Sequence, residues 1–287
     1  MYLLLLVSLI WAFSFGLTKR LAGIDSTAIA TLRLVLALVV FVPFLRSAAI
    51  SVRTGWRLAF IGAVQFGLMY LLYQRSYVYL PAYAVVLFTL TTPLYLALLD
   101  ALAERRLHLR YLLAAALALL GSATVCFNSP LQGDLLRGFW LIQLANICFA
   151  AGQVAWRRER DKLPENITSA SLFALPFAGA TVACAIGSLF FTDWPAVHLT
   201  LPQWGILAYL GMISSGLCFF WWNVGATRVN AGTLAVFNNA KVPLGIACSL
   251  LFFGEHANLP RLLIGGVLMI LGVWIAEKHS SPAGQDR

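Results

Sequence analysis

Ten apolar runs, each close to twenty residues long, constrain what this chain can fold into. They lie at about 3–19, 27–45, 56–76, 82–102, 110–127, 136–156, 168–191, 203–224, 232–253 and 261–276. A helix needs about 20 apolar residues to cross the hydrocarbon core of a bilayer. Because lipid offers no partners to exposed backbone groups, such runs form helices. The sequence therefore predicts an all-α integral membrane protein with ten transmembrane helices.

The composition agrees with this prediction and leaves little room for a soluble domain. Of the 287 residues, 61% are hydrophobic and 11% are charged, whereas soluble domains carry about 25% charged residues. The segments between the runs are short, and the five cysteines all fall inside apolar stretches. Cysteines placed in this way favour a packing role over a disulfide framework or a metal site.

The distribution of Lys and Arg predicts the orientation of the chain. If the N-terminus is inside, thirteen basic residues fall in inner segments and five in outer segments. The outer five are Lys19, Arg20, Arg75, Arg137 and Arg261. Cytoplasmic loops carry the excess of Lys and Arg, so both termini are predicted to be cytoplasmic. Topology thus explains the net charge of +9, and nucleic-acid binding is not expected.

The two halves of the chain resemble each other. The stretch "PAYAVVLFTLTTPL" (81–94) aligns with "NAGTLAVFNNAKVPL" (230–244). At an offset of 151 residues, Glu104, Arg110 and Gly121 match Glu255, Arg261 and Gly272. Apolar sequences share Leu and Ala by chance, but matched Pro, Glu, Arg and Gly favour a duplication. Five spans per half is an odd number, so the second copy is inverted, an arrangement typical of transporters with a substrate site at the midplane.

The sequence is divided accordingly into a first repeat at 1–134, a second repeat at 135–279 and a short tail at 280–287. Together with the string "SLIWAFSFG" (8–16) and the pattern of Glu followed by Gly in spans five and ten, this duplication resembles the EamA branch of the drug/metabolite transporter superfamily. The resemblance covers essentially the whole chain.

Within that family, several strings are similar to those of biotin uptake carriers of enteric bacteria, among them "LVLALVVFVPFLR" (34–46), "QFGLMYLL" (65–72) and "WNVGATRVNAGTLAVFNN" (222–239). The resemblance implies a bacterial inner-membrane carrier of a small metabolite that works by alternating access, with biotin as the leading substrate. Export or import of amino acids or related metabolites is the alternative, because residue types do not reveal the direction of transport.

Lys241 is the main candidate for binding a substrate. It lies near the centre of span nine, where a charged residue costs about 2.5–3.5 kcal/mol on insertion scales and is expected to face a cavity or a partner. Asn238 lies three residues earlier on the same helical face, and Asn239 and Pro243 flank Lys241. The alternative is a purely structural hydrogen-bond cluster between helices.

Arg33 in span two is the second cation within the membrane. It lies about six residues from the predicted outer end of the span, so its side chain either contacts substrate or extends to the interface. No Asp or Glu occurs inside any predicted span. Two cations without an internal carboxylate favour an anionic substrate such as a carboxylate.

Other polar and aromatic residues in the spans complete the candidate site. Amides able to bind the ureido group of biotin are Gln65, Asn146, Gln153, Asn223, Asn238 and Asn239. Rings able to pack on the substrate are Trp11, Tyr70, Tyr95 and Trp222. Each ring has the alternative of ordinary helix packing or of an interfacial belt.

Other classes of function fit the sequence less well. An intramembrane enzyme needs a nucleophile with a base, or metal ligands, at membrane depth. All four histidines lie outside the predicted spans, and neither a His-Glu-x-x-His nor a Gly-x-Ser-x-Gly motif occurs. We therefore expect no enzyme, no metal and no cofactor. A purely structural role would leave the duplication and the polar midspan cluster unexplained.

Overall fold

The computed structural model describes residues 2–46, 50–103, 132–164, 166–226, 228 and 231–277, together with isolated positions between 113 and 124. These described residues form helices and connecting turns, without strands. Six of their helices are long and apolar enough to cross a membrane, namely Tyr2–Lys19, Ser26–Phe44, Val52–Ser76, Asp134–Arg160, Ser169–Phe191 and Leu201–Ala226. Shorter apolar helices cover Ala82–Leu96, Lys241–Phe252 and Leu259–Gly272.

The helices follow the predicted apolar runs closely. The first half contains α1 (Tyr2–Lys19), α2 (Ser26–Phe41), α3 (Val52–Gly62), α4 (Met69–Ser76), α5 (Ala82–Phe88) and α6 (Thr92–Ala103). The second half contains α8 (Gln132–Arg160), α9 (Ser169–Leu172), α10 (Ala174–Phe191), α11 (Leu201–Ala208), α12 (Cys218–Ala226), α13 (Ala231–Phe252) and α14 (Leu259–Glu277). The predicted fifth span, 110–127, lies mostly outside the described residues.

Polar side chains set where several of these helices begin. Asp25 accepts a hydrogen bond from the backbone N–H of Ala28 at 2.8 Å and caps α2. Thr200 and Gln203 form a capping box at the start of α11. Such side chains satisfy N–H groups that the first turn of a helix leaves without partners. The starts of these two helices are therefore set by side chains within the first few residues of each helix.

Four predicted spans contain a change of helix type, one of them only at its end, where the 3-10 turn η1 (Val42–Phe44) follows α2. The π-helix η3 (Ala63–Leu68) joins α3 to α4, and the π-helix η6 (Tyr209–Leu217) joins α11 to α12. A 3-10 turn, η4 (Thr89–Thr91), joins α5 to α6. The π-helix is rare and often marks functional sites. Both π-helices lie in the third span of their half, as the sequence divides the chain.

The two matched prolines differ in their local structure. Pro93 lies at the start of α6, directly after η4, where its missing N–H costs no helical hydrogen bond. Pro243 lies inside the continuous helix α13, where a proline cannot donate to the carbonyl four residues earlier. The two halves thus share the proline, but the α-helix changes to a 3-10 turn just before Pro93 and is continuous around Pro243.

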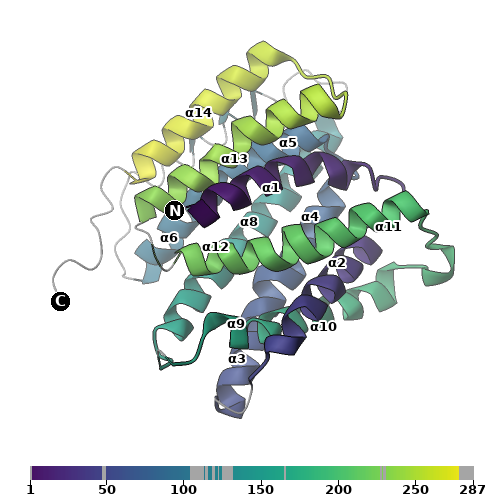
Figure 1. Ribbon diagram of the computed structural model, residues 1–287. Coiled ribbons are helices and arrows are strands. Elements are labelled where there is room, and N and C mark those ends of the chain that lie inside the picture. Colours follow the sequence, from purple (N-terminus) through teal and green to yellow (C-terminus); the bar gives the residue numbers. More distant parts are fainter. Residues whose placement is uncertain are drawn as a thin grey trace.

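The packing of the helices brings distant parts of the sequence together. Helix α1 lies beside α13, and α2 packs between α10 and η6 (Figure 1). Helix α8 packs against α4, α6 and η3. Glycine permits the closest of these approaches, because a Cβ at Gly152 on α8 would overlap the side chain of Gln65, and one at Gly62 would overlap the backbone of Pro176. Small residues allow such contacts between membrane helices.

Turns from different parts of the chain meet at two ends of the helix assembly. At one end, Lys19 donates to the carbonyls of Tyr77 and Leu80, and Glu255 accepts from the backbone N–H groups of Ala82 and Tyr83. We call this the Glu255 end. At the other end, the side chains of Arg57 on α3 and Glu159 on α8 form an ion pair. We call this the Glu159 end.

Candidate substrate-binding site

A small cavity lies where these helices converge. Its volume is about 80 Å³, and residues of α1, α2, α4, η4, α6, α8, η6, α12 and α13 line it. Five residues predicted from the sequence lie in its wall, namely Trp11, Arg33, Tyr70, Asn146 and Lys241. The fold therefore brings together these five side chains from five helices, α1, α2, α4, α8 and α13.

Arg33 is fixed in this wall by hydroxyl groups. Its Nε donates to Ser215 Oγ at 3.2 Å, its Nη1 to Thr18 Oγ1 at 3.2 Å and its Nη2 to Tyr70 OH at 2.9 Å. Its guanidinium also lies 4.7 Å from the centroid of the Tyr70 ring. The residue is only 2% exposed. The alternative in which Arg33 extends to the interface is therefore wrong, because these hydroxyls hold it inside the protein.

Lys241 enters the same cavity from α13 and lies against two indole rings. Its Nζ is 5.1 Å from the ring centroid of Trp11 and 5.9 Å from that of Trp222. The Nε1 of Trp11 donates to the carbonyl of Ser214 at 3.0 Å, which fixes the ring. An ammonium over an aromatic face is stabilised by the ring quadrupole. Lys241 is 6% exposed, so its side chain lies deep in the protein.

The charges around the cavity all have one sign. Arg33 and Lys241 line it, and the described residues of its wall include no carboxylate. The hydroxyls of Thr18, Ser215 and Tyr70 orient Arg33 but do not neutralise it. In surroundings of low dielectric constant, such a site attracts an anion from outside.

Asn146 and Gln143 on α8 compensate for the break between α5 and α6. The carbonyl of Phe88, at the break, accepts from Asn146 Nδ2 at 3.0 Å and from Gln143 Nε2 at 3.4 Å. Gln143 Oε1 accepts from Thr91 Oγ1 at 2.6 Å and from Tyr95 OH at 3.0 Å. Tyr95 thus holds Gln143 in place and does not line the cavity. Asn146 combines a structural bond with a place in the cavity wall.

The predicted residues Gln65 and Asn223 contact each other and do not line the cavity. Gln65 Nε2 donates to Asn223 Oδ1 at 3.2 Å, and Asn223 Nδ2 donates to the carbonyl of Phe219 at 2.9 Å. This pair ties η3 to α12. In this conformation it joins two helices, and its predicted contact with substrate stays a prediction.

Gln153 and Trp222 are fully enclosed, and each has polar atoms without a hydrogen-bond partner among the described residues. Both amide atoms of Gln153 and the Nε1 of Trp222 are in this state. Buried polar groups almost always have partners, so these atoms are candidates for binding water or substrate. The structure describes the backbone of Asn238 and Asn239 within α13, whereas their side chains lie outside the described residues.

Comparison with known proteins identifies the family. The sequence matches the EamA-like transporter family over residues 1–127 and 136–277. The chain belongs to the EamA-like transporter family. The chain is therefore a multi-pass membrane transporter, and its family does not indicate an enzymatic function.

Relatives of this EamA-like transporter carry names that specify a substrate. The probable biotin transporter of Pseudomonas aeruginosa is 40% identical over 95% of this chain and 96% of its own length. The biotin transporter of Escherichia coli K12 is 35% identical over 98% of this chain and 94% of its own. A solved crystal structure with 17% identity covers 96% of this chain and 95% of its own at a TM-score of 0.62, which shows the likeness of fold alone.

Sequence reasoning missed several residues that build the site of this EamA-like transporter. Gln143 is buried and engages Thr91 and Tyr95. It lies three residues before Asn146, on the same helical face, and this spacing could have identified it. Ser215 and Thr18 hold Arg33. Single hydroxyls in apolar runs are common in membrane helices, so the sequence offered no signal for them.

Proposed function

We propose that this chain is a biotin uptake carrier of the bacterial inner membrane that works by alternating access. The observation that carries the proposal is the central cavity, where Arg33 and Lys241 supply two positive charges and the described wall supplies no carboxylate. Biotin bears a carboxylate at the end of an apolar chain. The names of the relatives, biotin transporters in two organisms among others, support the choice of this anion.

The carboxylate would bind between Arg33 and Lys241. A guanidinium has five N–H donors, and three of those of Arg33 are directed to Thr18, Tyr70 and Ser215. One donor on each terminal nitrogen is thus left beyond these bonds, a geometry that suits the two oxygens of a carboxylate. The ammonium of Lys241, held over Trp11, supplies the second charge.

The ring system of biotin would lie against the rest of the wall. Because Asn146 Nδ2 donates to Phe88 and Thr91, its Oδ1 is the atom suited to accept from a ureido N–H. The rings of Trp11, Tyr70 and Phe219 offer apolar faces. Asn146, Trp11 and Tyr70 thereby keep the roles that the sequence predicts for them.

The cavity must enlarge before it can hold such a substrate. Its volume of about 80 Å³ is well below the roughly 300–1,000 Å³ of typical ligand pockets. In an alternating-access carrier the two halves move relative to each other around the site. The structure therefore corresponds, in this proposal, to a contracted conformation between those open to either side.

We propose ten transmembrane helices arranged as two inverted repeats, 1–134 and 135–279, followed by a tail at 280–287. The family match in two segments, 1–127 and 136–277, supports this division. The packing supports it too, because α1 packs on α13 of the other half and α8 packs on α6 of the other half. Likewise α2 packs on η6, and α10 packs on η3.

The contacts between turns support an alternating course of the chain. The turn after α1 contacts the turn before α5 through Lys19, and Thr192 after α10 donates to Asp25 before α2 at 2.5 Å. In each pair, one turn follows a span and the other precedes a span that runs in the opposite direction. Both turns of a pair therefore lie at the same end of the helix assembly. Together with the excess of basic residues at the other end, this supports cytoplasmic N- and C-termini.

The test is uptake of labelled biotin by a transport-deficient biotin auxotroph that expresses this chain. We expect rescue of growth at limiting biotin and accumulation of label above the empty-vector control. An amino-acid carrier would instead take up labelled amino acids and leave growth on limiting biotin unchanged. Normal membrane insertion without biotin uptake would contradict the proposal.

A second measurement tests the carboxylate contact itself. Biotin and its methyl ester are compared as competitors of uptake in wild type and in Lys241→Met. We expect wild type to prefer the acid, and the variant to lose at least about thirty-fold in affinity for it, as for truncation of one partner of a buried charge pair. Lys241→Arg is the matched control, because it keeps the charge. Equal affinities of wild type and Lys241→Met for the acid would remove Lys241 from the site.

A further inference from the structure

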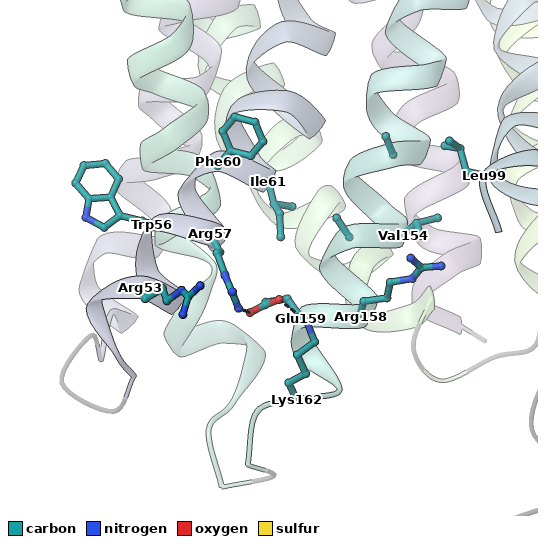
Figure 2. Close-up of a pocket in the computed structure, with 12 residues that line it drawn as sticks. Arg53, Trp56, Arg57, Phe60, Ile61, Leu99, Val154, Arg158, Glu159 and Lys162 are labelled. Carbon is teal, nitrogen blue, oxygen red and sulfur yellow. Dashed lines mark hydrogen bonds and ion pairs between the residues drawn. The ribbon is translucent and has the colours of Figure 1, made fainter. Parts of the chain in front are cut away.

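A second, larger cavity lies at the Glu159 end, between α3, α6 and α8. Its volume is about 700 Å³. Deep in the cavity the wall is aliphatic, with Ile61, Leu99 and Val154. Figure 2 shows that Arg53, Trp56 and Arg57 come from α3 on one side, and that Arg158 and Glu159 come from the end of α8 and Lys162 from the turn after it on the other. The cavity is therefore apolar inside and ionic at its mouth.

The mouth carries more positive than negative charge. Arg53, Arg57, Arg158 and Lys162 line the cavity with a single carboxylate, Glu159. Both oxygens of that carboxylate are engaged, Oε1 by Arg57 Nη1 at 3.2 Å and Oε2 by Lys162 Nζ at 3.0 Å. Three positive charges are thus in excess among the described lining residues, and Arg53 and Arg158 lie outside the ion pairs of Glu159.

Exposed aromatic side chains place this mouth at the membrane surface. Trp56 is 75% exposed and Phe60 is 70% exposed, and both lie on α3 next to the cavity. Figure 2 shows their rings on the side of α3 away from Glu159. Tryptophan next to Arg and Lys is typical of the interface between hydrocarbon and headgroups. The excess of basic residues assigns this end to the cytoplasmic leaflet.

We infer that this cavity binds an anionic phospholipid, with the phosphate at the basic mouth formed by Arg53, Arg57, Arg158 and Lys162 and an acyl chain along Ile61, Leu99 and Val154. The charge excess selects an anionic headgroup, because basic pockets between membrane helices on the cytoplasmic side bind such lipids. The aliphatic depth accommodates the chain. The ion pair of Arg57 with Glu159 joins α3 to α8, whereas the pair of Lys162 with Glu159 is local to the end of α8 and the turn after it.

Native mass spectrometry of the purified full chain tests this inference. The protein is titrated with phosphatidylglycerol or with phosphatidylcholine of the same acyl chains, in wild type and in Arg53→Gln/Arg158→Gln. We expect phosphatidylglycerol to be retained over phosphatidylcholine, and each arginine removed to weaken its retention about five-fold. Arg228→Gln is the matched control, since Arg228 is exposed and lies outside the cavity wall; it should retain phosphatidylglycerol as wild type does.

Two further arms separate the phospholipid from soluble anions. Glycerol phosphate in excess supplies the phosphate without acyl chains, and we expect it to leave bound phosphatidylglycerol in place. Biotin in excess should also leave it in place. Equal retention of both lipids, unchanged retention in the double variant of a folded protein, or displacement by either soluble anion would overturn the inference. Melting temperature of each variant reports whether it is folded.

Discussion

The Glu255 end and the Glu159 end use charged residues in opposite ways. At the Glu255 end, Glu255 accepts from the backbone N–H groups of Ala82 and Tyr83 at 2.8 and 3.0 Å, and Lys19 donates to two backbone carbonyls. At the Glu159 end, side chains pair with each other at a partly exposed surface, and cations outnumber the carboxylate around a cavity. One end satisfies its own backbone, while the other leaves cations in excess around a cavity.

This difference indicates which contacts hold the helices together and which ones face outward. The first N–H groups of a helix have no acceptor within the helix, and inside a protein water does not supply one. A carboxylate that accepts from these N–H groups therefore stabilises the start of the helix. A partly exposed ion pair competes with water and contributes little. The Glu255 end should therefore dominate stability, and the Glu159 end should dominate interaction with lipid.

The largest effect is expected from Glu255→Ala. The substitution leaves the N–H groups of Ala82 and Tyr83 at the start of α5 without their acceptor, and it removes the partner of Ser249. Each buried donor without a partner costs about 1–3 kcal/mol, so we expect a loss of about 3 kcal/mol. Thermal unfolding of the purified protein in detergent measures it. Glu255→Gln keeps one acceptor and should lose about half; a Glu255→Ala protein as stable as wild type would refute the comparison.

A smaller loss is expected from Lys19→Met. Lys19 Nζ lies 3.0 Å from the carbonyl of Tyr77 and 3.1 Å from that of Leu80. Both hydrogen bonds are only partly buried, so water can replace the lost donor and the cost should be about 1 kcal/mol. The same unfolding assay applies. Lys19→Arg retains a donor and should restore most of the stability. A loss as large as that of Glu255→Ala would mean that Lys19, not Glu255, is the main contact.

The smallest effect on stability is expected from Glu159→Gln. The exposed fractions of its partners' side chains are 48% for Arg57 and 62% for Lys162, so the change should be below about 1 kcal/mol. The same substitution removes the carboxylate from the cavity mouth, and phosphatidylglycerol retention should rise about five-fold. Asp134→Asn, which breaks the exposed pair with Arg137, should change neither quantity. Unchanged lipid retention in Glu159→Gln would break the proposed role of this end.

Much of the helical organisation could be predicted from the sequence, because apolar run length reports directly on membrane helices. The position of Lys241 inside the protein could also be predicted, since a cation in the middle of an apolar run must face protein or a cavity. The burial of Arg33 could not be predicted in this way. At its distance from the end of the span, the side chain could extend either to the interface or into the protein. Hydroxyl groups on α1, α4 and η6 hold it inside.

The remaining features depend on contacts between distant segments. Gln65 and Asn223 are 158 residues apart in sequence and pair only because η3 packs near α12. The changes of helix type were not predicted either, since the Gly, Ser and Gln residues of η3 and η6 also occur in regular membrane helices. Such features arise from packing, which no single span specifies.

The two π-helices change which side chains their spans turn toward the interior of the protein. Each π-helix holds an extra residue in its turn, and Ser215 Oγ reaches the carbonyl of Leu210, five residues back. One extra residue rotates the part of the helix that follows it by about 100° relative to a regular α-helix, one residue's share of a helical turn. The π-helix η6 thereby affects which of its side chains face the cavity, among them Ser214.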